Sequence, residues 1–261
     1  MAKKNSENLP AQWDEELAKY AQAAAELEKG SGGNFFGLKG GILTYDGAPV
    51  PNNKMCVVVL DAILENVYFE GAFDPDNPGS PKCYAYGRED ATMAPHQTVV
   101  ERGDAQHEKC AGCKQNAFGT AEQGKGKACR NTRRLAMIPA GTFNGEKLTL
   151  FTKPEHFTSS GIAFMKLPVT SVKDYSAFVK QLAVVLKRPP FAVATIVTVV
   201  PDAKTQFKVT FQAHQELPSA LIPTMMARHE EAKKSIDFPY PQFTDEAPKK
   251  EKPSKKKARK Y

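Results

Sequence analysis

The chain has 261 residues, of which 41% are hydrophobic, enough for one substantial core with an insertion but too few for two large independent domains. Its start lacks a secretion signal, and no apolar run approaches the length of a membrane span, so we expect a cytoplasmic protein without a membrane partner. The net charge is +7, and Lys249–Tyr261 alone carries this charge with eight basic residues and one acid. The rest of the chain is therefore neutral overall, and any nucleic-acid surface on it must be local.

The first third of the chain predicts an N-terminal helical arm, residues 1–34, followed by strands. Ala11–Lys29 has apolar residues at helical spacing and ends at a glycine-rich stretch. The runs typical of strands are Gly41–Tyr45, Lys54–Glu70 and Lys82–Tyr86. From about residue 83 to residue 130 the chain is irregular and polar, which predicts an inserted lobe too poor in apolar residues to fold without a metal.

Regular patterns resume after this lobe and complete a core that we place at residues 35–236. The predicted strands are Arg133–Pro139, Glu146–Lys153, Gly161–Val169, Phe191–Val200 and Thr205–Ala213. A capping-box signal at Thr170 and Ser171 begins an amphipathic helix that ends before Pro189, and a last helix spans about Ser219–Lys234. The expected fold is mainly β with helices, in the α+β class.

Beyond Ile236 the composition changes to proline, aromatic and charged residues, which predicts a flexible arm over residues 237–261. Phe238, Tyr240 and Phe243 form either a partner-docking motif or a segment that packs back on the body. The lysine-rich end is either a source of non-specific phosphate contacts or a solubilising terminus.

Four of the five cysteines lie close together in the sequence, at Cys83, Cys110, Cys113 and Cys129. The Cys-x-x-Cys turn at Cys110 presents two thiolates along one tetrahedral edge, and a distant pair completes a structural Zn²⁺ site without an open position. His107 and His96 compete for the fourth position. Thiol redox chemistry and unliganded cysteines are the alternatives. Cys56, in an apolar run, is expected to be a small buried side chain.

The outstanding basic segment is 114–134, with six Lys and Arg residues and one acid. This segment predicts either a basic surface that binds phosphates or a solvated loop. Aromatic residues near this segment and in a later basic strand offer stacking surfaces for bases, although each could equally belong to the core. The candidate nucleic-acid-binding residues are Lys125, Lys127, Arg130, Arg133, Arg134, Tyr84, Tyr86, Phe118, Lys147, Phe151 and Lys153.

Five or six strands with antiparallel hairpins, a late helix and an inserted lobe are compatible with an OB-type, partly open barrel. The arrangement of motifs across residues 35–215 resembles bacteriophage-encoded single-stranded DNA-binding proteins. The motifs that carry the resemblance are Val57–Asp61, Ser80–Gly87, Cys110–Cys113, Gly126–Arg134 and Pro201–Val209. The resemblance implies an OB-fold that coats single-stranded DNA, with a zinc lobe in some members. Many members end in an acidic tail, whereas this chain ends in lysines.

The expected function is therefore a non-catalytic protein that coats and protects single-stranded DNA in phage replication, recombination or repair, in the host cytoplasm. Replication or transcription proteins are expected partners of the N-terminal helix or the C-terminal tail. The alternative is a zinc-containing transcription accessory protein that contacts RNA polymerase and DNA. No hydrolytic constellation is visible, and the G-x-x-x-x-G-K match at Gly119–Lys125 lacks the following Ser or Thr and the preceding strand of a phosphate-binding loop, so we predict no enzyme.

Overall fold

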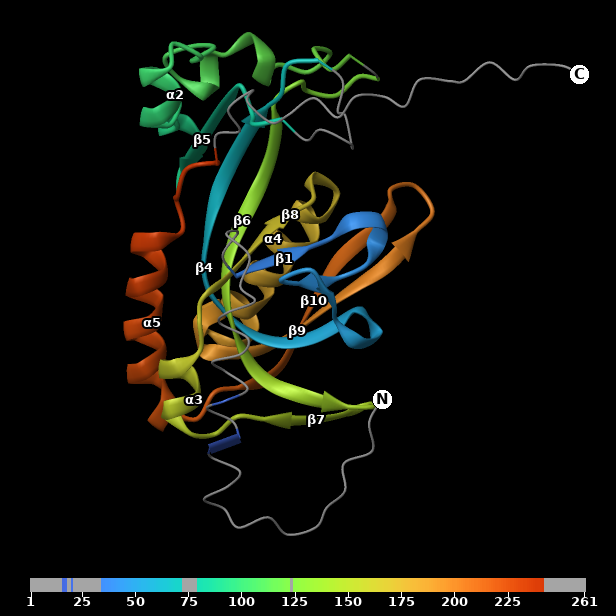
Figure 1. Cartoon of the computed structure of the whole chain (residues 1–261), viewed down its shortest axis with the longest axis vertical. Coiled ribbons are helices and arrows are strands. Elements are labelled where there is room, and N and C mark those ends of the chain that lie inside the picture. Colours follow the sequence, from blue (N-terminus) through green and yellow to red (C-terminus); the bar gives the residue numbers. More distant parts are fainter. Residues whose placement is uncertain (1–15, 18–19, 21–33, 72–78, 123, 242–261) are drawn as a thin grey trace, which may run out of the picture.

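The computed structural model describes residues 16–17, 20, 34–71, 79–122 and 124–241. Within these ranges, strands β1 to β10 form one sheet along the path β10-β9-β4-β6-β8-β1-β2-β3, and β5 and β7 branch from β4 and β6 (Figure 1). The pairing of β1 with β8 is parallel, and the other pairings are antiparallel. The fold is thus α+β, as predicted, with a large open sheet.

Every strand and helix predicted in the second half of the chain is present, but β6 extends beyond its predicted range at both ends, and helix α3 was not predicted. The strands are β1 Phe35–Gly37, β2 Thr44–Tyr45, β3 Ala48–Pro49, β4 Lys54–Tyr68, β5 Cys83–Gly87, β6 Arg130–Asn144, β7 Lys147–Leu150, β8 Ala163–Leu167, β9 Val193–Asp202 and β10 Gln206–Glu216. The helices are α2 Gln97–Glu101, α3 Pro154–Ser159, α4 Val172–Gln181, which continues into a π-helical turn at Leu182–Leu186, and α5 Ile222–Ser235. Of the predicted N-terminal helix, only Glu16, Leu17 and Tyr20 lie within the described ranges, and all three are helical and exposed.

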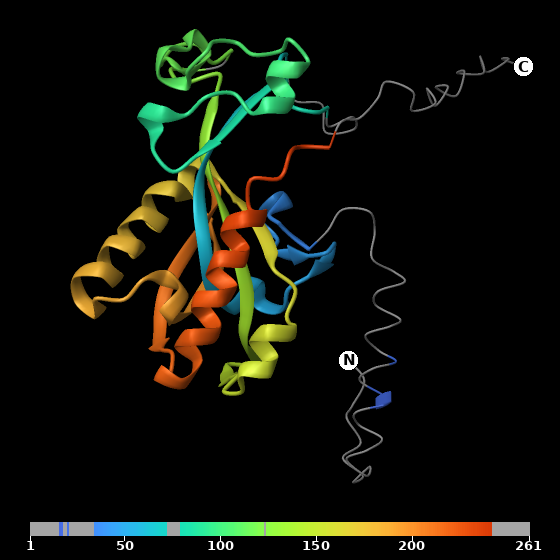
Figure 2. The same cartoon turned by 90° about the vertical axis from the view of Figure 1, so that its left-hand side faces the viewer.

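The two long strands β4 and β6 form the centre of the sheet and are buried on both faces. This explains why the first half of β4 is a nearly continuous apolar run rather than an alternating pattern. Met55, Val57 and Val59 face one core, whereas Val58 and Leu60 face the other. Helix α4 covers the first core with Tyr175 and Phe178, and helices α3 and α5 cover the second (Figure 2).

A β-bulge in the middle of β4 exchanges the faces of the strand. Val59 pairs with Met137, and Asp61 pairs with Ala136. Between these two pairs β4 has one extra residue, Leu60, that has no partner on β6. Before the bulge, odd-numbered residues of β4 face the first core, which α4 covers and which we call the α4 core. After the bulge, odd-numbered residues face the other side: Ile63 lies in the second core, which we call the α5 core, and Glu65 and Val67 follow on the same face.

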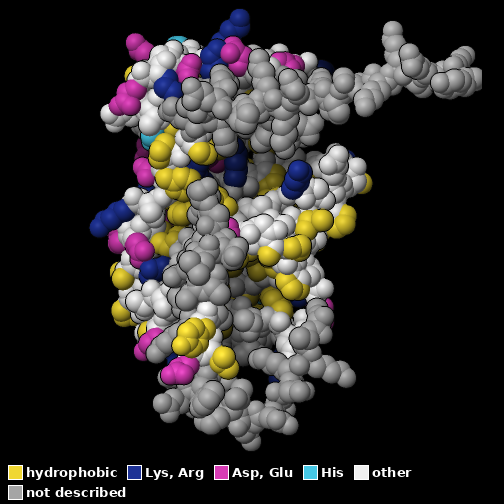
Figure 3. Space-filling view, viewed as in Figure 1, with side chains coloured by type: hydrophobic (Ala, Val, Ile, Leu, Met, Phe, Trp, Pro, Cys, Tyr) yellow, Lys and Arg dark blue, Asp and Glu magenta, His cyan; other side chains and the backbone are white. Residues whose placement is uncertain are grey.

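The sheet is open but curled, because its β1–β3 end approaches β10. The turn Lys39–Gly41 contacts β10, and a Cβ placed on Gly41 would lie 3.3 Å from the Cβ of Phe207. Gly41 also has a φ of 77°, in the left-handed region that favours glycine. On the face shown in Figure 3, hydrophobic side chains gather below the lobe. Phe35, Ile42 and Tyr45, in or beside β1 and β2, are exposed.

The segment between β5 and β6 forms a lobe at one end of the long strands (Figure 1). β5 extends the sheet by pairing Leu64–Tyr68 with Gly87–Cys83, and two small clusters fill the lobe, one around Tyr84 and Val99 and one around Met93 and Cys110. Acidic and basic side chains are mixed over the lobe in the view of Figure 3. The lobe's apolar clusters are small, consistent with its polar sequence.

The first residues beyond α5 pack on the body. Phe238 contacts Phe35 and Phe164 with ring centroids 5.4 and 4.9 Å apart, and the hydroxyl of Ser80 donates to the carbonyl of Pro241 at 2.7 Å. Of the two predictions for Phe238 and Tyr240, packing on the body is therefore confirmed, and residues 237–241 do not form a free arm. Phe243 and the lysine-rich end lie outside the described residues.

Candidate nucleic-acid interface and cysteine cavity

The four cysteines that the sequence singled out line one small cavity, about 20 Å³ in volume, inside the lobe. Cys83 begins β5, Cys129 immediately precedes β6, and a single 3₁₀ turn separates Cys110 from Cys113. Backbone hydrogen bonds tie these segments together. Cys110 N–H donates to the carbonyl of Met93 at 2.9 Å, and Cys129 N–H donates to that of Gln115 at 2.8 Å. Segments far apart in the sequence thus present their thiols to a shared space.

The chemistry of the cavity is that of buried thiols. Burial, reinforced by the neighbouring Cys110, Cys83 and Cys113, raises the pKa of Cys129 to about 12. A metal ion bound here would have to displace the thiol protons, and the soft thiolates produced are ligands that Zn²⁺ prefers. Among the described residues, no three His, Cys, Asp or Glu side chains are arranged as a metal-ligand group. The cavity therefore offers a suitable donor set, but without ligand geometry.

Only one of the two competing histidines lies at this cavity. His107 lines it beside Cys110 and Cys113. His96 instead caps helix α2, where its Nδ1 accepts from the backbone N–H of Thr98 at 3.3 Å, and its ring stacks on Tyr84 at 5.2 Å. Because His96 is engaged away from the thiols, we remove it from the candidate ligands.

A groove of about 450 Å³ lies where the lobe meets the end of β4. Tyr68 and Phe69, at the end of β4, form one part of its lining, and Lys127 and Arg130 form another. The guanidinium of Arg130 is 6.0 Å from the ring centroid of Phe69. We call this feature the lobe groove. It combines partly exposed aromatic rings with basic side chains at a spacing that lets both contact one strand of nucleic acid.

Three more side chains extend this surface. Lys166 of β8 places its Nζ 5.9 Å from the ring centroid of Phe69. Phe118 is 81% exposed, and the Nζ of Lys127 lies 5.1 Å from its ring centroid. Lys125 is exposed in the loop next to Lys127. Lys125, Lys127, Arg130 and Phe118 thus remain candidates for nucleic-acid binding.

Tyr68, Phe69 and Lys166 are not among the binding residues that the sequence predicts. Lys166 stands between the buried Met165 and Leu167 in β8, so strand alternation alone could have placed it on the opposite face. No pattern indicated that β8 would lie close to the end of β4, because β6 separates them in the sheet.

Arg134 is buried in a cluster of its own rather than exposed to phosphates. It is 4% exposed, and its Nη2 donates to Glu65 Oε1 at 2.8 Å and to the Tyr86 hydroxyl at 2.6 Å. Its Nη1 donates to the carbonyls of Ile236 and Phe238 at 3.1 and 2.9 Å. Although burial opposes its charge, the carboxylate of Glu65 raises the pKa of Arg134. This arginine therefore leaves the set of candidate phosphate-binding residues.

The C-terminal segment completes this arginine cluster, which consists of Glu65, Tyr86, Arg134, Phe238 and Tyr240. The guanidinium of Arg134 lies 4.1 and 4.3 Å from the ring centroids of Phe238 and Tyr86. Tyr240 donates its hydroxyl to Glu65 at 2.7 Å and accepts from Lys166 at the same distance. Burial, then Glu65, raises the pKa of Tyr240, which therefore keeps its proton.

The remaining predicted residues do not join the lobe groove. Tyr84 is 2% exposed and bonds to Thr98, so it has no free face for a base, and Tyr86 is engaged by Arg134. Arg133 lines a different cleft. Phe151 stacks on His156 at 4.8 Å. Lys147, Phe151 and Lys153 lie in or just after β7, at the end of the sheet opposite the lobe (Figure 1).

None of the helices in the described part of the chain has the length and apolar character needed to cross a membrane. Comparison of the chain with protein-family models, with curated proteins and with solved structures finds no match.

Proposed function

We propose that this chain is a non-catalytic single-stranded DNA-binding protein that coats and protects single strands in phage DNA replication, recombination or repair. The observation that carries the proposal is the lobe groove, where the partly exposed rings of Tyr68 and Phe69 lie beside Lys127 and Arg130. Proteins that bind single strands without sequence preference use this combination. Cations follow the phosphates, and aromatic rings stack on bases, each contributing about 1–3 kcal/mol.

The curled sheet supports an OB-type, partly open barrel as the scaffold. Its β1–β3 end approaches β10 through the turn Lys39–Gly41, and α4 packs against the core on one face of the sheet. In such barrels, nucleic acid binds on one face of the barrel and on the neighbouring loops. The proposed site, the lobe groove, joins the end of β4 to the loop before β6.

In this proposal, Zn²⁺ has a structural role. Cys83, Cys110, Cys113 and Cys129 would hold it, with His107 as the competing ligand, because all five line the same cavity. Four thiolates stabilise a zinc ion without leaving a position open for catalysis. Cys129 precedes Arg130 directly, so a fixed Cys129 also fixes the start of β6 and the basic side chains beside it.

Titration of a fluorescent, unstructured oligonucleotide tests the function. We expect tight binding at low salt, weaker binding to duplex, and an affinity that falls as salt increases, because each phosphate contact releases counterions. Replacing Lys127 and Arg130 together with glutamine should reduce the slope of log affinity against log salt by about 1.4, which corresponds to two lost contacts on a single strand.

The matched control removes two charges at the other end of the sheet, with Lys147→Gln and Lys153→Gln. These residues are exposed but distant from the lobe, so the affinity and the salt slope should stay unchanged. An equal loss in both double variants would reject the lobe groove as the site. Absence of binding at low salt, or equal preference for duplex, would reject the function itself.

A further inference from the structure

A gap along one edge of β4 creates a second concave site. β9 pairs with β4 only from Lys54 to Val57, and β5 pairs with it only from Leu64 to Tyr68. Between these pairings, residues 58–63 have no neighbouring strand on that edge within the described ranges, and the bulge at Leu60 lies in this stretch. The sheet is therefore interrupted where α4 and α5 flank it (Figure 2).

A cleft of about 500 Å³ occupies this interruption, and we call it the sheet cleft. Its floor is apolar and comes from β4, with Val59, Leu60 and Ala62. Tyr175 of α4 and Phe191 contribute aromatic rings to its walls. This size and this lining are typical of sites for small molecules, in which a few polar groups orient an otherwise apolar contact.

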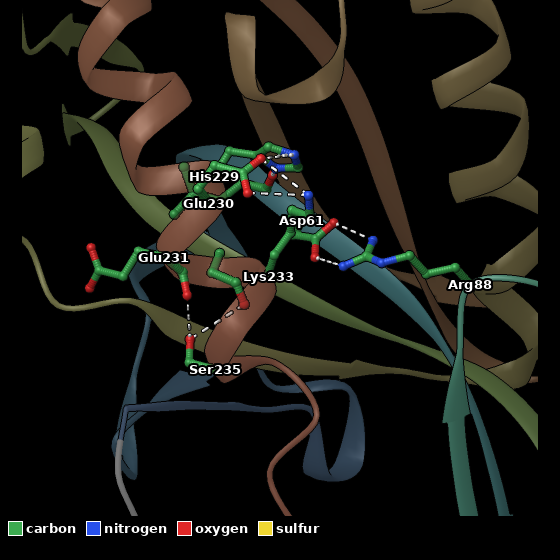
Figure 4. Close-up of polar contacts among 9 residues, drawn as sticks. Asp61, Arg88, His229, Glu230, Glu231, Lys233 and Ser235 are labelled. Atoms are coloured by element: carbon green, nitrogen blue, oxygen red, sulfur yellow. Dashed lines mark hydrogen bonds and ion pairs between the residues drawn. The ribbon is translucent and has the colours of Figure 1, made fainter.

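Three of the polar groups in the sheet cleft, Asp61, Arg88 and His229, already have partners. The carboxylate of Asp61 accepts two hydrogen bonds from Arg88, from Nη1 to Oδ1 at 3.0 Å and from Nη2 to Oδ2 at 2.6 Å. His229 of α5 contacts the carbonyl of Leu60 through Nδ1 at 2.6 Å, and since a carbonyl can only accept, this nitrogen carries the proton. Figure 4 shows Arg88 reaching Asp61 from the side opposite α5. The single carboxylate of the cleft is thus already paired.

Arg133 is one of two cations of the cleft that have no ion-pair partner among the described residues. It is half-buried, and its Nη1 donates to the carbonyl of Thr132 at 3.1 Å. Burial lowers the pKa of Arg133, which reflects the cost of removing its charge from water. Lys180 of α4 is the second cation of the lining, and it too has no ion pair within the part of the chain that the structure describes. The cleft therefore has positive charge in excess over an apolar floor.

We propose that the sheet cleft binds a small organic anion, whose phosphate or carboxylate pairs with Arg133 while its apolar body lies over β4 between Tyr175 and Phe191. The guanidinium provides two parallel donors that match either anion. The site is separate from the lobe groove, because Arg130 and Arg133 are three positions apart in β6 and so point to opposite faces of the sheet.

Calorimetric titration of the full chain tests this proposal with dAMP as a phosphate probe, benzoate as a carboxylate probe, and adenosine as the uncharged control. We expect saturable binding of at least one anion and none of adenosine. The affinity should fall at least about tenfold in Arg133→Gln, because a charged hydrogen bond is lost. Lys180→Gln, which changes an exposed residue and leaves the core intact, should weaken binding as well.

The controls separate the cleft from general charge effects and from the lobe groove. Lys208→Gln removes one positive charge from β10, outside the cleft, and Arg130→Gln changes only the groove, so both should retain anion binding. Failure of both anions to bind wild-type protein at low salt would overturn the proposal. Equal weakening in Lys208→Gln and in Lys180→Gln would also overturn it, as would loss in Arg130→Gln.

Discussion

Replacing Arg134 with alanine should lower the free energy of unfolding by about 3–5 kcal/mol, because it leaves a buried carboxylate without its counterion. Glu65 is fully buried, and Arg134 is its ion-pair partner at 2.8 Å. The same substitution removes the hydrogen bonds that hold the carbonyls of Ile236 and Phe238. The C-terminal segment should therefore detach together with the loss of stability. Urea denaturation measures the first effect, and hydrogen exchange at residues 236–241 measures the second.

Two further variants distinguish this cause from a general effect of losing an arginine. Arg188→Ala removes an arginine whose pair with Glu216 is about half exposed, and it should cost less than about 1 kcal/mol. Replacing both partners, with Glu65→Leu and Arg134→Met, should be less destabilising than Arg134→Ala alone, since no unpaired charge remains buried. A loss below about 1 kcal/mol in Arg134→Ala would show that the cluster contributes little.

Cys129→Ser is expected to unfold the lobe while the sheet remains folded, provided that the proposed zinc ion is bound. The apolar clusters of the lobe are small, and a structural zinc site contributes about 10–16 kcal/mol of binding free energy in small domains. We expect native mass spectrometry to find one zinc per chain in the wild type and none in the variant. Hydrogen exchange should accelerate over residues 88–129 but not in β9 or β10.

Cys56→Ala is the matched control for that experiment. Cys56 is 2% exposed in the α5 core, and burial raises its pKa to about 11, so it is an unreactive core thiol away from the cavity. Its substitution should leave the zinc content unchanged. Protein that contains no zinc after purification in zinc-supplied medium would contradict the metal site, and unchanged exchange in Cys129→Ser would contradict its structural role.

The local patterns of the chain predicted most elements of the core. Apolar alternation in Thr205–Ala213 and the apolar run of Phe191–Val200 predicted a hairpin. Strands β9 and β10 form it, with bounds shifted by one to three residues. The apolar stripe through Tyr175 and Phe178 placed α4 correctly, with Ser171 at its N-cap. The predicted capping box does not form, because the Ser171 hydroxyl makes no capping hydrogen bond and instead accepts from the backbone N–H of Val209 at 2.9 Å. These elements depend on neighbours within a few residues, so one sequence is sufficient to find them.

The candidate site was predicted less completely, because its residues meet only through the sheet. Lys127 and Arg130 were found from the charge of their own segment. Phe69 and Lys166 carried no such signal, since they join that segment only when β4, β6 and β8 lie side by side. Conversely, Tyr84 was predicted as a stacking surface, and only its packing against Val67 and Val99 showed that it belongs to a core.

Composition and spacing alone determined that this protein has a neutral body, a basic C-terminal end, a cysteine-bearing insertion and an α+β core, because each of these follows from residues close together in the chain. The tertiary structure decided which of the basic side chains are buried in ion pairs and which line a groove or a cleft. The bulge at Leu60 exchanges the faces of β4 and so brings Glu65 to Arg134, and the C-terminal segment then covers that pair. Arg130, Arg133 and Arg134 are nearly adjacent in sequence, yet they reach a groove, a cleft and a buried ion pair. Strand alternation in β6 sends these arginines to different faces of the sheet. The extra residue in β4, far away in the sequence, determines which side chains they meet there.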